Sequence, residues 1–401
     1  MVERRQAVGQ VYVVGQGDVG QLGLGPDVLE KARFTPIPVL DNIVDVTSGG
    51  MHTLCLTADG QVFSFGCNDE GALGRPTSSL EPTSESTPAL VKLPEPIAQL
   101  SAGDSHSAAL AVSGTVYMWG NFRDSTGQVG LVTEGSAAQE PKKVATNIVQ
   151  IASGSDHVAM LTAEGDILTM GCPEQGQLGR IGSYFAARGS RRPVSVLITP
   201  TKVPMPRTKG ARSAGFDRVW AGAYTTVARQ RKTGQLFCWG LNNYSQLGSF
   251  VGSADKAGDI IYHPRPMSCS SGQRWKLVSG GQHHSLLLSE EGEVFALGRK
   301  EYGRLGLGTS TPAEDEDQQT PARVPGLAGC TDVSCGEATS HTIDGQGRLF
   351  SWGIGSNNQL GLGDEEDKFE PQVVSGRLAD KCTLVVSGGG QHTVILVGPA
   401  V

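Results

Sequence analysis

The 401-residue sequence lacks several features that define common protein classes. It has no apolar run near the roughly 18 residues that a membrane-spanning helix needs. The first residues, Met1 to Ala7, contain Glu3, Arg4 and Arg5 but no apolar stretch of a secretory signal. We therefore expect a soluble monomer without a membrane partner.

Signatures of covalent chemistry are also missing. The eight cysteines form no C-x-x-C pair, and their density is too low for a disulfide scaffold, which favours a reducing compartment. H-E-x-x-H, P-loop and G-x-S-x-G motifs are absent. GQGDVG (15–20) reads G-x-G-x-x-G, but it lies inside a repeat and no helix pattern follows it. We expect no metal, no cofactor and no enzymatic chemistry.

The charge and glycine content suggest a turn-rich binding protein. A net charge of -7 argues against a globally basic nucleic-acid binder. The 55 glycines are spread evenly along the chain, which favours one large repeat-built β domain.

Two motifs alternate along the chain, each in seven copies. The first is a β-type run ending in Gly, then a polar turn and a Leu-Gly or Val-Gly pair, at 15–23, 66–74, 120–130, 171–179, 240–248, 298–306 and 353–361. The second leads a β-branched run into a small-residue turn and a His or Thr, at 47–52, 101–106, 152–157, 221–225, 279–283, 334–339 and 387–392. Copies of the first motif are 51 to 69 residues apart, enough for four strands of about 5 to 6 residues plus turns.

These repeats predict an all-β, seven-bladed propeller of four-stranded blades, with strands A to D running from the axis outward. Proline-containing segments such as 35–40, 87–93 and 140–144 suit the outer strand D, whose free edge tolerates proline. The chain begins with C and D strands and ends with A and B strands, so the two ends should pair to close the ring. We expect one domain over residues 11–401, after a short N-terminal remnant, residues 1–10.

In such a meander the A–B and C–D turns emerge on one face and the B–C turns on the other. Residues distant in sequence should therefore ring one surface: Asp18, Asp104, Asp156, His283 and His392. Histidine recurs in five copies, at His52, His106, His157, His283 and His392 by our alignment, as expected for a residue that bonds its own turn. The two A–B turn aspartates fit either Asx turns or partner recognition.

Two irregularities interrupt the repeat. The third C–D turn spans eleven residues rather than nine and contains Phe122, Arg123 and Asp124, an apolar ring beside two opposite charges that we expect to project from this face. A tolerated insertion is the alternative. Residues 180–216 contain eight Lys and Arg residues, among them Arg180, and no Asp or Glu. Arginine clusters suit the capture of carboxylates or phosphates. A solvated basic loop is the alternative interpretation.

The chain resembles the family of the regulator of chromosome condensation, the chromatin-bound guanine-nucleotide exchange factors of the Ran GTPase. The resemblance runs from about Val11 to Val397 and rests on QGDVGQLGLG (16–25), GGMHTLCL (49–56), FGCNDEGALGR (65–75), SGGQHHS (279–285) and YGRLGLG (302–308). It implies a wedge at Phe122 to Val129 that enters the GTPase beside its phosphate-binding loop. It also implies a nuclear, chromatin-associated protein.

The resemblance further implies site residues. GTPase contacts would come from Asp18, Asp104, Phe122, Arg123, Asp124, Asp156, Arg180, Asn243, His283 and His392. Contacts to the nucleosome, at the histone acidic patch, would come from Ser183, Arg188, Arg191 and Arg192. DNA contact in similar proteins uses a basic N-terminal tail, whereas only Arg4 and Arg5 precede the first strand here.

Two alternatives stay open. The first is a non-catalytic propeller scaffold for histones or other partners. The second is a light sensor, because a plant photoreceptor shares the repeat, but that protein relies on clustered tryptophans and the five here are dispersed.

Overall fold

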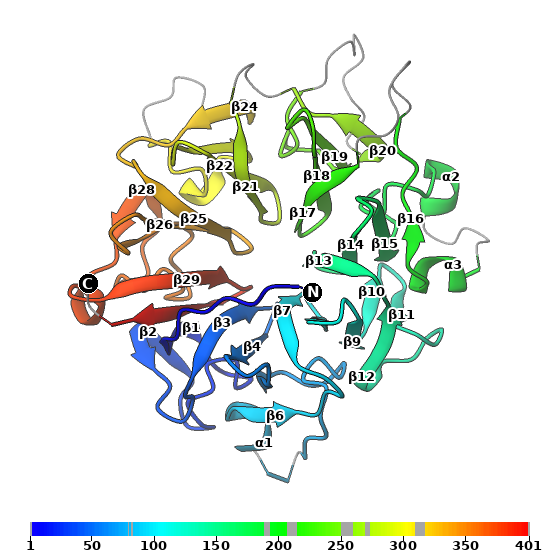
Figure 1. Cartoon of the computed structure of the whole chain (residues 1–401). Helices are drawn as coiled ribbons and strands as arrows, with labels where there is room; N and C mark the ends of the chain where they lie inside the picture. Colours follow the sequence, from blue (N-terminus) through cyan, green and yellow to red (C-terminus); the bar gives the residue numbers. More distant parts are fainter. Residues whose placement is uncertain are drawn as a thin grey trace.

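A computed structural model describes residues 2–78, 80–81, 83–187, 193–206, 215–249, 260–268, 273–308 and 317–399. Seven four-stranded antiparallel sheets surround a central axis, so the predicted seven-bladed propeller is confirmed (Figure 1). Each sheet is one blade, with its strands in meander order from the axis outward.

The blades are numbered from the first complete sheet. Blade 1 contains β3 (Ile43–Ser48), β4 (His52–Thr57), β5 (Val62–Gly66) and β6 (Ala89–Val91). Blade 2 contains β7 (Ile97–Ala102), β8 (His106–Ala111), β9 (Val116–Gly120) and β12 (Ala138–Ala145). Blade 3 contains β13 (Ile148–Ser153), β14 (His157–Thr162), β15 (Ile167–Gly171) and β16 (Thr201–Lys202). Blade 4 contains β17 (Phe216–Gly222), β18 (Thr225–Gln230), β19 (Leu236–Leu241) and β20 (Ile260–Pro266).

The remaining blades complete the ring. Blade 5 contains β21 (Trp275–Gly280), β22 (His284–Ser289), β23 (Val294–Gly298) and β24 (Gln318–Arg323). Blade 6 contains β25 (Cys330–Cys335), β26 (Thr339–Asp344), β27 (Leu349–Gly353) and β28 (Lys368–Val373). Blade 7 combines both chain ends: β29 (Cys382–Gly388), β30 (His392–Gly398), β1 (Gln10–Gln16) and β2 (Glu30–Pro36).

Short elements decorate the loops. They are α1 (Thr83–Ser86), α2 (Ser183–Ala186), α3 (Ser195–Ile198), η1 (Glu301–Gly303), η2 (Gly376–Leu378) and a hairpin of β10 (Phe122–Asp124) with β11 (Gly127–Gly130). Helices α2 and α3 lie at the outer rim of blade 3 (Figure 1). No helix in the described ranges is long and apolar enough to cross a membrane.

Pairing of β1 with β30 closes the ring, as expected from the order of motifs. The register runs from Gln10 opposite Val397 to Gly15 opposite His392. A second closure lies at the axis, where the A–B turns of neighbouring blades bond to each other through their backbones. Seven N–H···O bonds of 2.8 to 3.2 Å run around the axis, the last from Gly390 N–H to the Gly50 carbonyl.

The apolar core lies between blades rather than within one. Every buried cluster joins strands of neighbouring blades, so the B strands pack on both faces. Strand β4 is buried at all six positions, whereas the outer strand β2 is mostly accessible. This burial explains why HTLCL reads as a continuous run and not as an alternating one.

Two glycine positions of the repeat have a steric explanation. Gly66 ends its C strand at φ 114°, and a Cβ there would lie 2.5 Å from the Met51 carbonyl oxygen. In the A–B turn, a Cβ on Gly154 would lie 2.2 Å from Cε1 of His157. Glycine therefore lets the C–D turn approach the A–B turn and lets the histidine fold under its own turn.

A buried polar relay links neighbouring blades. The residue after each turn-end His or Thr carries a hydroxyl in six blades, and each hydroxyl donates to a C–D turn carbonyl of the preceding blade. We call the contact between two neighbouring blades a seam. At four seams a histidine of the preceding blade also bonds this hydroxyl through Nε2 at 2.9 Å, as His157 does with Thr226. Because the hydroxyl proton goes to the carbonyl, the imidazole must donate from Nε2.

The relay corrects one alignment from the sequence. His284, not His283, occupies the buried position equivalent to His52, since His284 pairs with Gly298 as His52 pairs with Gly66. Two adjacent histidines made this register ambiguous. His283 is instead the last residue of its turn and is partly exposed.

Residues 2–9 lie on the face that carries the B–C turns, and they run from near the axis outward to blade 7 (Figure 1). Val2 N–H donates to the Val112 carbonyl, Arg4 Nε donates to the Ile97 carbonyl at 2.6 Å, and Arg5 pairs with Asp45 at 3.5 Å. Both arginines that precede the first strand are therefore engaged within the propeller.

We predict that Thr226→Val lowers the free energy of unfolding by about 1–3 kcal/mol, because the buried His157 Nε2–H loses its partner while the shape is nearly kept. Urea unfolding followed by tryptophan fluorescence measures the change. Thr201→Val, at an exposed position of β16, serves as the matched control. An unchanged midpoint for Thr226→Val would contradict a stabilising role for the relay.

Candidate functional site

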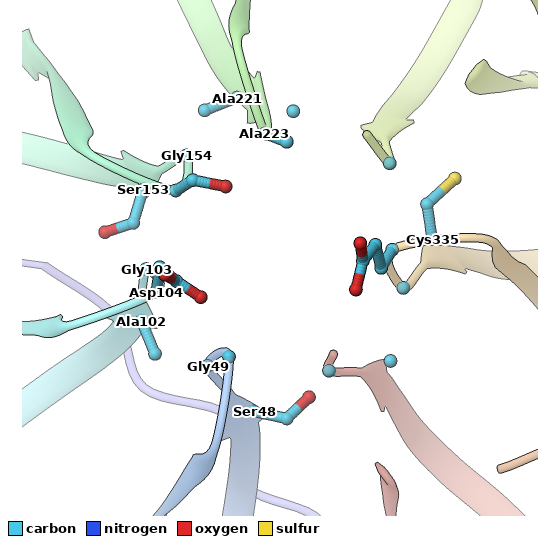
Figure 2. Close-up of a pocket in the computed structure, with 18 of the residues that line it drawn as sticks. Ser48, Gly49, Ala102, Gly103, Asp104, Ser153, Gly154, Ala221, Ala223 and Cys335 are labelled. Atoms are coloured by element: carbon cyan, nitrogen blue, oxygen red, sulfur yellow. The ribbon is translucent and has the colours of Figure 1, made fainter. Parts of the chain in front are cut away.

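The seven A–B turns line a cavity of about 390 Å³ on the axis, at the face that also carries the C–D turns. Its walls are mostly Gly, Ser and Ala, and Asp104 extends toward its open centre (Figure 2). Asp156 and Glu337 also line it. Backbone bonds confirm that the A–B and C–D turns share one face. The first residue of each C–D turn donates its N–H to a carbonyl in the A–B turn of the same blade, as Cys172 does to the Asp156 carbonyl at 2.7 Å. We refer to this opening as the channel mouth.

The β10–β11 hairpin stands beside the channel mouth and is held by carboxylates from three turns. The backbone N–H of Arg123 donates to Asp156 Oδ1 at 2.8 Å. Glu70, from the C–D turn of blade 1, pairs with Arg123 at 3.3 Å and accepts from Gln128 Nε2 at 2.7 Å. Glu174, from the C–D turn of blade 3, accepts the Ser125 N–H at 3.0 Å. Asp124 accepts from Thr126 within the tip.

Crowded carboxylates give the channel mouth unusual electrostatics. Burial raises the pKa of Asp156 to about 7, and the neighbouring Asp104 and Asp124 add to the rise while the Arg123 N–H opposes it. Burial also raises the pKa of Asp104, against the pull of Arg123. The pKa of Glu337 is raised by burial and by Asp104. A cationic partner would favour the charged forms of these carboxylates and so offset the effect of their burial.

His283 belongs to an aromatic and cationic cluster on the far side of the mouth. Its ring lies 4.8 Å from Tyr244 and 6.5 Å from Tyr224. Arg299 stacks on Tyr244 at 4.6 Å. Burial, with Arg304 and Arg299, lowers the pKa of His283 to about 4. The imidazole is therefore neutral at pH 7 and can act as a hydrogen-bond donor or acceptor.

Asp18 and Asn243 occupy the same position in two C–D turns, and both are exposed. In each turn a glutamine bridges the residue: Gln21 Nε2 donates to Asp18 Oδ1 at 3.1 Å, and Gln246 Nε2 donates to Asn243 Oδ1 at 3.2 Å. Part of each side chain thus serves its own turn, and the rest is open to a partner.

Two predicted site residues are not where the sequence suggested. Phe122 was expected to project, but it is 0 % exposed and packs 4.8 Å from the ring of His106. His392 was expected on the turn surface, but it begins β30 at 1 % exposure and bonds Thr53. Phe122 points inward because Arg123 points outward along the same strand. His392 is buried because it is the relay histidine of blade 7.

Arg180 also has a structural environment. Its guanidinium donates to Thr169 Oγ1, to the Thr169 carbonyl and to the Val196 carbonyl at 2.9 to 3.2 Å. Arg75 makes equivalent bonds to Ser64 and Ser84 in blade 1. Burial lowers the pKa of Arg180 to about 10. Both arginines tie a C–D turn to its strand.

A match to the family model described as the RCC1-like domain covers residues 10–395. The chain belongs to the RCC1-like family. It is 44% identical to the regulator of chromosome condensation of Xenopus laevis over 97% of this chain and 90% of that protein. It is 30% identical to the guanine nucleotide exchange factor SRM1 of Saccharomyces cerevisiae, over 96% of this chain and 86% of that protein.

A solved structure agrees with the fold. The crystal structure of Prp20p from Saccharomyces cerevisiae superposes with a TM-score of 0.87 at 30% identity, covering 100% of this chain and 93% of that one. Prp20p is described there together with its binding properties to Gsp1p and histones.

In this RCC1-like chain, α2 and α3, which are described parts of the segment 180–216, lie at the rim of blade 3, away from the axis (Figure 1). Ser183 is exposed in α2, beside exposed Tyr184 and Phe185. Arg188, Arg191 and Arg192 lie outside the described residues. Lys202 is engaged in an ion pair with Asp166 at 2.6 Å.

Sequence reasoning missed several residues of this face: Glu70, Glu174, Tyr224, Tyr244, Arg299 and Glu337. Each lies in an A–B or C–D turn or just after one, so considering every polar or aromatic turn residue would have found them. Within the described part of the chain, no group of three or more His, Cys, Asp or Glu side chains is placed to hold a metal ion.

The raised pKa of Asp156 predicts a pH-dependent stability. Because the folded pKa, about 7, exceeds the usual 3.8, folding favours the protonated form. This contribution is complete below about pH 4 and is lost as the pH rises through 7. We expect Asp156→Asn, which keeps an acceptor for Arg123, to raise the Tm progressively relative to the parent from pH 5 to pH 8. Asp18→Asn, at an exposed turn position, is the control; a pH-independent difference for Asp156→Asn would rule out this titration.

Proposed function

We propose that this chain is a guanine-nucleotide exchange factor that binds the Ran GTPase through the channel-mouth face while docked on chromatin. The observation that carries the proposal is the acidic mouth with its hairpin, in a chain whose relatives include an exchange factor by name. The binding properties of Prp20p to Gsp1p and histones support the choice of partners.

Exchange of a bound nucleotide requires no covalent chemistry. The factor binds the nucleotide-free GTPase more tightly than the loaded one, and the coupling is reciprocal, so nucleotide also expels the factor. A nucleotide held at about picomolar affinity is bound by roughly -16 kcal/mol, and a broad interface must offset a large part of it. We accordingly propose an exchange factor rather than an enzyme, acting as one domain over residues 11–401.

The residues of the face divide this task. Asp104, Asp156 and Glu337 offer negative charge to basic side chains of the GTPase, whose approach lowers their mutual repulsion. The hairpin tip, with Arg123 and Asp124, is the element that would enter the GTPase and displace its nucleotide. His283 and its tyrosines provide a neutral, partly apolar contact on the other side of the mouth.

Chromatin docking uses a different surface in this proposal. The segment from Ser183 to Arg192 begins in α2 at the rim of blade 3 and carries the arginines suited to the acidic patch of the nucleosome. Because α2 lies at the rim, away from the axis, we propose that the two partners are held by separate surfaces. We therefore propose a nuclear, chromatin-associated protein. Arg4 and Arg5 are bonded within the propeller, so they are poor candidates for DNA contact.

The tryptophans argue against a light-sensing role. Trp119, Trp239 and Trp352 are 0 % exposed, and each indole N–H donates to a C–D turn carbonyl of the preceding blade. They serve as blade-to-blade structural contacts.

We predict that Asp156→Ala slows exchange at least about tenfold, because it removes both an interfacial carboxylate and the acceptor that holds the hairpin. The assay follows release of a fluorescent GDP analogue from Ran with catalytic factor and excess GTP. Asp166→Ala is the matched control, because Asp166 lies at the B–C turn of the same blade and its carboxylate pairs with Lys202.

Nucleosome binding by Asp156→Ala should stay at the parent level, since that surface lies at the rim. Equal loss of both activities would contradict two separable surfaces. If the parent chain binds nucleosomes but never accelerates GDP release, the scaffold becomes the better account of the fold.

A further inference from the structure

One seam between blades lacks the polar relay. At the position that carries a hydroxyl in six blades, blade 3 has Val158. The facing histidine of blade 2, His106, is 0 % exposed, and neither of its ring nitrogens has a hydrogen-bond partner among the described residues. The relay histidines at the other four seams all bond through Nε2. This seam is therefore chemically different from the others.

The same seam, like those of blades 1, 5 and 7 with their preceding blades, also has no tryptophan link. In blades 2, 4 and 6 a C-strand tryptophan donates to the C–D turn of the preceding blade. Blade 3 carries Met170 at this place, one residue before Gly171 as Trp119 precedes Gly120. On its inner side, the C–D loop of blade 2 therefore packs against the apolar side chains of Val158 and Met170. That loop is the one that departs from the repeat and forms the β10–β11 hairpin.

Phe122 occupies this seam. It shares one buried cluster with Val158, Met170 and Val129, and its ring tilts 58° against His106 at 4.8 Å. The next residue, Arg123, is exposed and bonds outward to Asp156 and Glu70. The root of the hairpin is therefore held by apolar packing inside and by charged hydrogen bonds outside.

We propose that Phe122, seated on Val158, Met170 and His106, is a positioning residue that sets the height and angle of the hairpin without itself touching the GTPase. Val158 offers no hydroxyl to the C–D turn of blade 2, and the apolar ring of Phe122 packs in this seam instead. The inference rests on the proposed exchange function, because it assigns how that function's displacing element is held.

The test compares Phe122→Ala with Phe122→Leu. Alanine empties the seat, so the hairpin loses its inner support; we expect kcat for GDP release from Ran to fall about tenfold or more, with KM within about threefold, because the carboxylates of the mouth still dock the GTPase. Leucine refills the seat without an aromatic ring and should restore kcat to within about threefold. Amide hydrogen exchange at Arg123 should be faster in Phe122→Ala and near the parent rate in Phe122→Leu.

A third variant tests the seam itself. Val158→Thr supplies the hydroxyl that Thr53 and Thr226 carry, which gives His106 Nε2–H an acceptor. We expect its Tm to rise by about 1–3 °C. A lower Tm would overturn our account of the seam.

The outcomes separate the two proposals. A parent chain without exchange activity would defeat the exchange function whatever the variants do. With an active parent, a folded Phe122→Ala variant with normal kcat would overturn the positioning role. So would a Phe122→Leu variant as impaired as Phe122→Ala with unchanged Arg123 amide exchange, because the aromatic ring would then act on the GTPase directly. If Phe122→Ala fails to fold, Phe122→Leu still decides the question: a kcat that falls about tenfold with unchanged Arg123 amide exchange would overturn the positioning role.

Discussion

Closure of the ring is the constraint on which the rest of this structure depends. Strand β1 pairs with β30, and seven backbone bonds join the A–B turns around the axis. Because the core lies between blades, a ring that opened at any seam would expose two apolar faces at once. The buried relay reinforces each seam with hydroxyls that satisfy turn carbonyls, and glycine is required wherever a turn approaches its own histidine. Stability and the shape of the channel mouth thus arise from the same contacts.

The rigid A–B turns also carry the three carboxylates that line the channel mouth. Backbone bonds fix the A–B turns that carry Asp104, Asp156 and Glu337, and burial raises the pKa of all three side chains. A surface of this kind is less stable alone than with a cationic partner. This electrostatic preference suits a protein whose proposed task is to hold a GTPase only while its nucleotide is absent. Permanent binding would end the cycle of nucleotide exchange.

Repetition also explains where function is found. Six seams carry the hydroxyl relay, and the one that lacks it supports the hairpin. The C–D connection of blade 3 includes α2 and α3, which lie at the rim. Both departures involve loops that the repeat does not need for closure, so they change without loss of the ring. The two proposed binding surfaces therefore lie at two different places, one beside the axis and one at the rim.

The sequence by itself determined the number of blades, the strand order, the closure by both ends and the face shared by Asp18, Asp104 and Asp156, because glycine turns and β-branched runs are local signals. It did not determine the direction of side chains within turns. Phe122 and His392 read as surface residues, yet both are buried, and His283 was aligned with a relay position that His284 fills. Only the tertiary structure decided these, because burial depends on what the neighbouring blade presents, 50 or more residues away in the chain.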